Sequence, residues 1–513
     1  MRKVHSLFIV FIMLTIILSG CVQQLQNTQP EPITGIDDGA VKVIYEDVGP
    51  SQGGILNLFM VSPKTLNPLT TQDTYVRQLS TFVFDSLFYE DESGLIKNGL
   101  VNSYVYSQDG LIFDIELRDN ILYHDGKMLS SGDVAFSIET IKKADEKSLY
   151  RDHVANIQSI KVLTKLSFRL ILHKPDTAFI ERLTFPIIPK HAFEEWPVEG
   201  HKDSLKLIGT GPFKYDSYNS DSISFLRNDD WWFLKAEDGI SHPIWLDGIT
   251  FKLYSDKSQM MQAFQRQQID IAWLEEGDLE SYSKRSDIFF NNYVSNILEF
   301  LVLSPEGETD SPLGKENFRA AIIDYLGIYE QQNPLNMGES AIDSEISDSE
   351  IKIYQNTTIS SLVDLGFFYD YDKDYLYFFK NSVKTPVHLS LIYNGLNSDR
   401  EYTGQWLTDA LAGIGIRVDI QTADVGKQQS LINTRKFDMM LLGCRIPLYA
   451  AENEMLEYIK KSLNMGQVDN VILPLYRKYG AVLYHNNIRG ERNPIWKNIY
   501  NGWQQWYLVH PNP

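Results

Sequence analysis

The first twenty-one residues constrain this chain most, because they decide where it folds. Met1-Arg2-Lys3 is a short cationic start, and residues 7–18 are apolar apart from Thr15. This run is too short to span a bilayer as a stable helix, but it matches the apolar core of an export signal. We therefore expect residues 1–20 to be a signal peptide and the rest of the chain to fold outside the cytoplasm.

The signal ends in Leu18-Ser19-Gly20-Cys21, which resembles the lipobox of bacterial lipoproteins. In those proteins the cysteine is lipidated and becomes the new N-terminus, and several acyl chains anchor more stably than one. A plain transmembrane anchor with an incidental cysteine is the alternative, but Ser19 and Gly20 favour lipidation of Cys21. The expected location is the outer face of the cell membrane, or the periplasm. Cys444 is then the one free thiol, so we expect no intrachain disulfide.

Composition indicates a large exported protein that avoids polyanions. The chain has 513 residues, 43% of them hydrophobic, which is enough for two to four domains with buried cores. The formal net charge of −20 repels nucleic acid, so we expect no nucleic-acid partner. Residues 21–50 are rich in Gln, Asn, Thr and Pro, which predicts a flexible tether between the lipid and the folded body.

Hydrophobic periodicity predicts mixed α/β structure after the tether. The predicted strands include residues 53–59, 111–117, 416–420 and 437–442, and the predicted helices include residues 74–87, 131–141, 402–412 and 428–433. The order strand, helix, strand over residues 416–442 indicates a parallel α/β unit. His124-Asp125-Gly126-Lys127 predicts a hairpin turn.

Many short motifs keep a fixed order along the chain. They occupy residues 53–56, 65–68, 83–87, 107–110, 115–118, 123–126, 133–137, 188–191, 209–213, 268–272, 413–418 and 473–476. Together they resemble the family 5 extracellular solute-binding proteins, the peptide, oligopeptide and nickel receptors of ABC importers. The order and spacing hold from about Gly53 to Leu508, which makes the resemblance specific.

The resemblance implies an α/β clamshell of the periplasmic-binding-protein-like II type. It has two lobes that close on a ligand about a hinge, and a small extra α+β domain inserted in the first lobe. Lobe I would comprise residues 51–90, 205–285 and 488–513. The extra domain would comprise residues 91–204, and lobe II residues 286–487.

The same resemblance implies where a ligand would bind. In peptide-binding members the ligand backbone pairs with strand edges from both lobes, and these edges would lie near residues 72–75 and 443–445. The expected ligand-binding residues are Asp73, Thr74, Tyr75, Tyr393, Asn394, Cys444 and Arg445. Tyr75, Tyr393 and Asn394 are equally compatible with packing of the lobes. Arg445 is equally compatible with a solvated loop charge.

One departure from the family pattern bears on the ligand. Many peptide binders continue Gly-Trp-x-x-Asp after the strand that matches residues 437–442, and the aspartate pairs with the α-ammonium of the peptide. This chain reads Gly443-Cys444-Arg445, so the acid is missing and a cation stands beside its place. A buried ammonium without a partner is costly. Either Glu452 or Glu454 replaces the acid, or the ligand carries an anion that Arg445 holds, or binding has decayed.

The leading hypothesis is a lipid-anchored, monomeric receptor that captures a peptide or peptide-like solute and delivers it to an ABC permease in the membrane. The alternative is a sensory lipoprotein that uses the same clamshell without import. No nucleophile-base constellation occurs in the sequence, so we expect no enzyme. Residues 370–374 imitate the start of an EF-hand, but Tyr375 and Asn381 replace the Gly and Glu that the loop needs. We therefore expect no metal site and no cofactor.

Overall fold

The computed structural model describes residues 49–91, 95–195, 207–235, 243–274, 282, 285–306, 311–332, 348–446, 452–466 and 468–509. The expected signal peptide, Cys21 and nearly all of the expected tether lie outside these residues. Among the helices described, none has both the length and the apolar character needed to cross a membrane.

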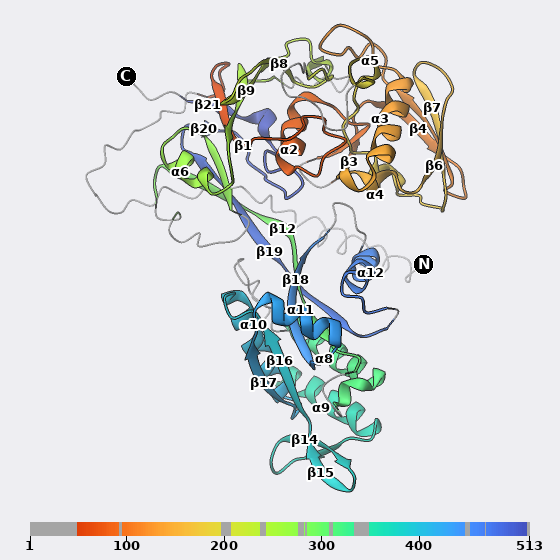
Figure 1. Ribbon diagram of the computed structural model, residues 1–513, viewed down its shortest axis with the longest axis vertical. Helices are drawn as coiled ribbons and strands as arrows, with labels where there is room; N and C mark the ends of the chain where they lie inside the picture. The colour runs from red at the N-terminus through yellow and green to blue at the C-terminus, as the bar shows by residue number, and fades with distance from the viewer. Residues whose placement is uncertain are drawn as a thin grey trace, which may run out of the picture.

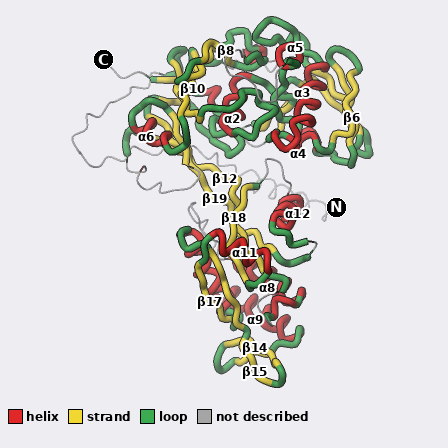
Figure 2. Tube along the Cα trace, in the orientation of Figure 1, coloured by secondary structure: helices red, strands yellow, loops and turns green. Residues whose placement is uncertain are grey.

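Two bodies are joined by a pair of long strands (Figure 1). β12 (Ile288–Leu303) and β19 (Ile472–His485) pair antiparallel and run from the larger body into the smaller one. In Figure 2 they form the yellow connection between the two bodies. Val482 belongs to the core of the larger body, whereas Leu301 and Leu473 belong to a core of the smaller one. We call the larger body lobe I with its extra domain, and the smaller body lobe II.

A four-stranded sheet carries the core of lobe I. Its strand order is β1 (Ile55–Val61), β10 (Gly248–Tyr254), β9 (Ser222–Arg227) and β8 (Phe213–Tyr218), with β1 and β10 parallel and the other pairs antiparallel. The apolar side of α2 (Thr74–Val83) belongs to the same core.

Helix α2 ends four residues before the predicted end at Leu87. Phe84 takes an extended conformation, with φ −124° and ψ 141°. The carbonyl oxygen of Val83 then accepts a hydrogen bond from the backbone N–H of Gly211 at 3.0 Å. A Cβ atom at Gly209 would overlap the same carbonyl oxygen, so this close approach requires glycine where the chain re-enters lobe I.

The extra domain is a four-stranded antiparallel sheet with helices. The strand order is β4 (Val101–Tyr106), β5 (Ile112–Leu117), β7 (Ser167–Leu172) and β6 (Ile157–Val162). The predicted first helix of this domain is α3 (Ser131–Ala144), and the backbone N–H of Ser130 donates to Asp133 at 2.9 Å in a capping box. The short helix α4 (Arg151–Val154) follows.

The predicted hairpin turn at Gly126 is also confirmed, since the backbone N–H of Gly126 donates to the carbonyl oxygen of Tyr123 at 2.8 Å.

Lobe II is built on a six-stranded mixed sheet. The strand order is β11 (Ile271–Leu274), β19, β12, β18 (Met439–Arg445), β16 (His388–Tyr393) and β17 (Arg417–Thr422). β16 is parallel to both β17 and β18, and the other pairs are antiparallel. The predicted parallel α/β unit is therefore confirmed as β17, α11 (Val425–Thr434) and β18.

Helices cover both faces of this sheet. α8 (Glu316–Gln332), α9 (Asp348–Asp364) and α10 (Ser398–Ala412) pack on one face with Leu301 and Leu441. α11 and α12 (Glu452–Ser462) pack on the other face with Phe300 and Met440. Consecutive strand residues point to opposite faces, so both faces need an apolar cover.

A three-stranded sheet lies at the far end of lobe II (Figure 1). It consists of β13 (Phe368–Asp370), β14 (Tyr375–Lys380) and β15 (Val383–Pro386). The segment that imitates an EF-hand is the turn between β13 and β14, where Asp370 pairs with Lys384 at 2.6 Å. Within the described ranges, no three His, Cys, Asp or Glu side chains gather as metal ligands.

The two-lobe α/β architecture predicted from the sequence is confirmed. The residue ranges given to the lobes remain predictions. β11 shows why a boundary in sequence is hard to draw, because it pairs with β19 in the lobe II sheet while Ile271 and Trp273 pack in the core of lobe I.

Candidate functional site

A cleft of about 670 Å³ lies where lobe I, the extra domain and lobe II meet. This volume falls within the range of about 300–1,000 Å³ that is usual for small-ligand sites. Lobe I lines the cleft with Gln72, Thr74, Tyr75, Arg77, Gln78, Trp273, Trp496 and Ile499; the extra domain with Glu146, Ser148, Leu149, Arg151, Asp152 and His153; and the connecting strands and lobe II with Tyr293, Ser295, Asn296, Ile297, Arg445, Ile446 and Tyr458.

The first turn of α2 forms part of the lobe I wall. Asp73 is the N-cap of the helix and accepts hydrogen bonds from Tyr75 N at 2.8 Å and from Val76 N at 3.4 Å. Burial raises the pKa of the Asp73 carboxyl, against the lowering effect of these hydrogen bonds. The ring of Tyr75 packs against Phe59 and Trp273, with centroid distances of 5.8 and 5.7 Å. This wall is therefore fixed by helix capping and aromatic packing.

One turn further along α2, two polar side chains form the inner part of the same wall. Arg77 is 8% exposed, and its Nη2 donates to Trp496 O at 3.4 Å. Gln78 is 5% exposed, and its carboxamide oxygen has no hydrogen-bond partner in the described part of the chain. A buried acceptor of this kind is destabilising unless a donor meets it.

The extra domain supplies a charged rim. Arg151 lies 3.7 Å from Glu146 and 3.3 Å from Asp152, and all three side chains are substantially exposed. Next to them His153 is buried, with its Nδ1 2.7 Å from Arg182 O. Burial lowers the pKa of His153 to about 3, so this imidazole is neutral at physiological pH.

Lobe II contributes the end of β18. β18 pairs with β12 through the Ile297–Arg445 pair, and Ile446 N then donates to Asn296 O at 2.8 Å. On its other side β18 pairs with β16 only at Met439 and Met440. In the part of the chain that the structure describes, no strand pairs with the remaining edge of residues 441–445. The exposed Arg445 ends this open edge, facing the cleft.

The fold and the cleft agree with the result of a family comparison. The model of the bacterial extracellular solute-binding proteins, family 5 Middle, matches residues 96–329. Solved structures that share the fold cover about nine-tenths of the chain. The chain therefore resembles the family 5 bacterial extracellular solute-binding proteins, whose model covers somewhat less than half of it. Proteins of this family are the solute-binding components of ABC importers.

Two solved structures illustrate the likeness in fold. The ABC transporter substrate-binding protein CtaP from Listeria monocytogenes matches with a TM-score of 0.59 and 19% identity, covering 90% of this chain and all of that one. The murein tripeptide-binding protein MppA, in its unliganded open form, matches with a TM-score of 0.64 and 15% identity, covering 91% and 98%. At these identities the likeness establishes the fold of this chain, and not its ligand.

Curated relatives match over a shorter stretch. The glutathione-binding protein GsiB from Salmonella paratyphi A is 25% identical over 198 residues. The match covers 38% of this chain and 37% of the relative. The chain therefore spans little more than a third of the length of the relatives it matches.

The structure brings three of the seven expected ligand-binding residues to the cleft: Thr74, Tyr75 and Arg445. Asp73 lies beside it as the helix cap. The other three, all in lobe II, are not among the cleft-lining residues, and they are Tyr393, Asn394 and Cys444. A ligand role for each of the seven remains a prediction.

The three lobe II residues outside the lining have clear structural surroundings. Tyr393 is 5% exposed in the lobe core, and a Cβ atom on Gly404 would come within 2.9 Å of its ring. Asn394 accepts a hydrogen bond from Leu396 N at 3.1 Å in a turn. Cys444 is half-buried, and burial raises the pKa of its thiol to about 11, so the thiol stays protonated.

A buried charge cluster lies under the open edge of β18. Glu299 is 2% exposed and accepts two hydrogen bonds from Arg400, at 2.8 and 3.2 Å. Lys478 lies 3.8 Å from Glu299 and 3.4 Å from Asp399. A Cβ atom on Gly443 would come within 2.8 Å of Arg400 Nη2 and would overlap Glu299 Oε1. The cluster thus supports the strand end that carries Arg445.

Sequence reasoning missed Arg77, Gln78 and the extra-domain rim. The helix pattern at residues 74–87 holds a signal for the first two, because both polar residues fall between apolar positions of a helix that is buried on most sides. No local pattern marks the rim. It reaches the cleft because Gln72 Nε2 donates to the carbonyl oxygen of Glu146, a contact between distant parts of the chain.

Proposed function

We propose that the protein is a lipid-anchored receptor of an ABC importer that captures a peptide or peptide-like solute in the cleft between its lobes. It delivers the bound solute to a permease in the membrane and works as a monomer. It changes no bond in the solute.

The open edge of β18 is the observation that carries this proposal. An extended peptide pairs its backbone with such an edge, and main-chain pairing tolerates many side chains. The edge ends beside the 670 Å³ cleft, so a paired segment would continue into the cleft. On the opposite side, the start of α2 and the rings of Tyr75 and Trp273 offer a surface for side chains.

Closure is the second part of the proposal. Lobe I and lobe II are joined through β12 and β19, and the pairing register between these strands shifts between Val294 and Leu298. A bulge of this kind is a site where strands bend and twist. Residues 295–297, inside the bulge, line the cleft, so a ligand there contacts the bending region directly. Ligand then shifts the equilibrium toward a closed form that the permease recognises.

Anchoring completes the proposal. Cys21 carries the lipid, and residues 22–50 give the receptor reach above the membrane. The support for this step is the sequence of residues 1–21 alone.

Mass spectrometry of small molecules that co-purify with the full chain tests the binding function. We expect a peptide-like species in stoichiometric amount. Adding this species back to the ligand-free protein should shift the fluorescence of Trp273 and Trp496, which both line the cleft. A full chain that neither carries nor binds any peptide would contradict the proposal. For the anchor, labelling with a palmitate analogue should be lost in Cys21→Ala and retained in Cys444→Ala.

A further inference from the structure

The inner polar part of the cleft consists of two consecutive residues of α2. Arg77 and Gln78 both line the cleft and are both more than nine-tenths buried. The carboxamide oxygen of Gln78 is shielded from solvent and accepts no hydrogen bond from any described residue. Buried acceptors in folded proteins nearly always have a donor, because the unmet group is costly. Gln78 thus calls for a donor that the described chain does not supply.

The described lining of the cleft has one more cation than it has acids. Its described lining holds Arg77, Arg151 and Arg445 against Glu146 and Asp152. Both acids lie within 3.7 Å of Arg151, at the exposed rim. Arg77 and Arg445 line the cleft from lobe I and lobe II, respectively. Charge complementarity therefore favours a solute with an anionic group in the inner part of the cleft.

Lobe II carries a cation two residues before the place at which the family pattern has an acid. Arg445 stands at the end of the open edge of β18, beside the place of the aspartate that pairs with a peptide ammonium in many relatives. A guanidinium group suits a planar carboxylate, which it binds through two parallel hydrogen bonds. This segment therefore lacks the acid of the pattern it resembles and carries a cation nearby.

We propose that the cleft selects solutes with a carboxylate next to an amide, the chemistry of the C-terminal end of a peptide. The amide N–H donates to Gln78 Oε1, and the carboxylate binds Arg77. Arg445 joins the same carboxylate as the lobes close. This inference rests on the proposed function and adds the polarity of the ligand: the carboxylate end, and not the ammonium end, enters the inner cleft.

A library of tripeptides to pentapeptides tests the polarity. Equimolar free-acid and C-terminally amidated forms are passed over the immobilised full chain, and retained peptides are counted by mass spectrometry. We expect at least about tenfold enrichment of the free acids. Equal retention of the two forms would overturn the inference and leave the proposed function standing. Retention of neither form would overturn both.

Acetylation of the N-terminus gives the reverse arm of the same experiment. We expect acetylated peptides with a free carboxylate to be retained as well as their unblocked forms. Loss of retention on acetylation would show that an acid, such as Glu452 or Glu454, holds the ammonium, and it would overturn the inference.

Two substitutions of Gln78 test whether the ligand group beside it is anionic or cationic. With the best-retained free-acid peptide, we expect Gln78→Leu to weaken affinity about tenfold, since one hydrogen bond is lost. We expect Gln78→Glu to weaken it further, because a second carboxylate repels that of the ligand. Unchanged or tighter binding by Gln78→Glu would overturn the inference. The fluorescence of Trp273 and Trp496 reports binding, and thermal unfolding checks that each variant is folded.

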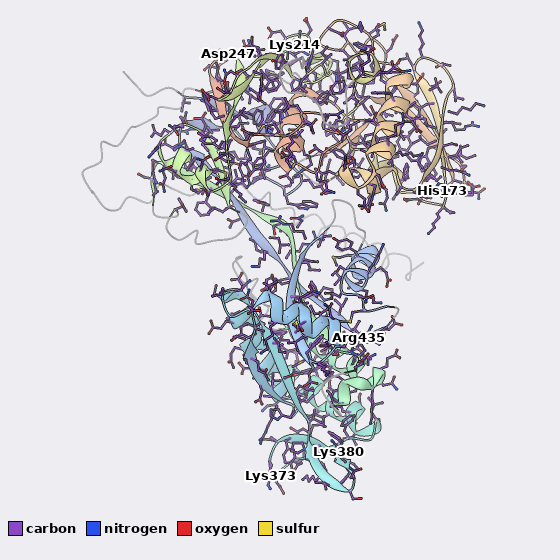
Figure 3. All side chains as sticks on the ribbon, in the orientation of Figure 1. His173, Lys214, Asp247, Lys373, Lys380 and Arg435 are labelled. Atoms are coloured by element: carbon purple, nitrogen blue, oxygen red, sulfur yellow. The ribbon has the colours of Figure 1, made fainter. Side chains whose placement is uncertain are left out.

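One arginine variant and one lysine variant complete the set of substitutions. Arg445→Gln removes an exposed cation from the cleft, so it leaves the fold intact and should weaken binding about tenfold. Lys373→Gln removes an exposed cation at the far end of lobe II and is the matched control (Figure 3). Equal affinities in these two variants would contradict a role for Arg445.

Discussion

The two walls of the cleft are built in opposite ways. In lobe I, Gln78 is buried on a helix whose first turn packs on Phe59 and Trp273. In lobe II, Arg445 is exposed at a strand end, and the strand is supported from below by the buried Glu299 cluster. Lobe I therefore presents a preformed polar site held by apolar packing, whereas lobe II presents an exposed charge held by other charges. The two walls should respond to different perturbations.

The largest effect is expected when the lobe II support is broken. Glu299→Gln leaves Arg400 and Lys478 without their shared buried carboxylate, and removing one partner of a buried ion pair costs about 3–5 kcal/mol. Urea unfolding should show this loss. Binding should weaken as well, because the end of β18 loses its support.

Glu306→Gln is the matched control. Glu306 pairs with Arg435 at 3.0 Å, but its side chain is 62% exposed, so its removal should cost less than about 1 kcal/mol. Figure 3 labels Arg435 in lobe II. Similar losses in the two variants would show that the Glu299 cluster does not support the lobe.

A smaller loss of stability is expected from adding a side chain at Gly443, next to the Glu299 cluster. Gly443→Ala would push a methyl group against Glu299 and Arg400, and overpacking of this kind costs about 1–3 kcal/mol. In Gly327→Ala the added methyl group meets no atom within 4 Å inside α8, so this variant should gain about 0.5–1 kcal/mol. Equal unfolding midpoints for the two variants would contradict the close approach at Gly443.

Acidic pH should instead destabilise the junction between the extra domain and lobe I. Burial lowers the pKa of His124 to about 4, and its Nδ1 accepts a hydrogen bond from Gly209 N at 3.2 Å. The folded pKa lies below the unfolded value of about 6.5, so the stabilisation is complete above pH 6.5 and is lost as the pH falls toward 4. At pH 5 the loss should be about 1–2 kcal/mol. Hydrogen exchange should show the junction of the extra domain with lobe I opening first.

Substitutions test this assignment. His124→Gln cannot take up a proton, so the change in stability between pH 7 and pH 5 should be smaller than in the unsubstituted chain. His173→Gln, at an exposed position on the extra domain, is the matched control (Figure 3). An unaltered pH dependence in both variants would exclude His124 as its source.

The sequence predicted most of the framework and part of the site. The parallel unit of β17, α11 and β18 follows from local periodicity, and the capped start of α3 follows from Asp133. The end of α2 does not follow, because the carbonyl oxygen of Val83 is claimed by Gly211, which lies far along the chain. Elements whose limits depend on such contacts are outside the reach of local patterns.

The same distinction applies to the site. Arg445 was expected from a motif, and the structure places it at the cleft. Gln78 was not expected, because a polar residue in an amphipathic helix is normally a solvated one. Its importance comes from burial without a partner, and burial is a property of the assembled fold.

The position of β19 in the lobe II sheet has a consequence for folding during synthesis. This strand lies between β11 and β12, yet it is made almost last. Trp503 and Trp506, later still, belong to the core of lobe I. Neither lobe can complete its interior during synthesis from the N-terminus, so both lobe cores form only after nearly the entire polypeptide is available. For the export proposed above, such a delay keeps the lobes open while the chain is threaded through a translocation channel.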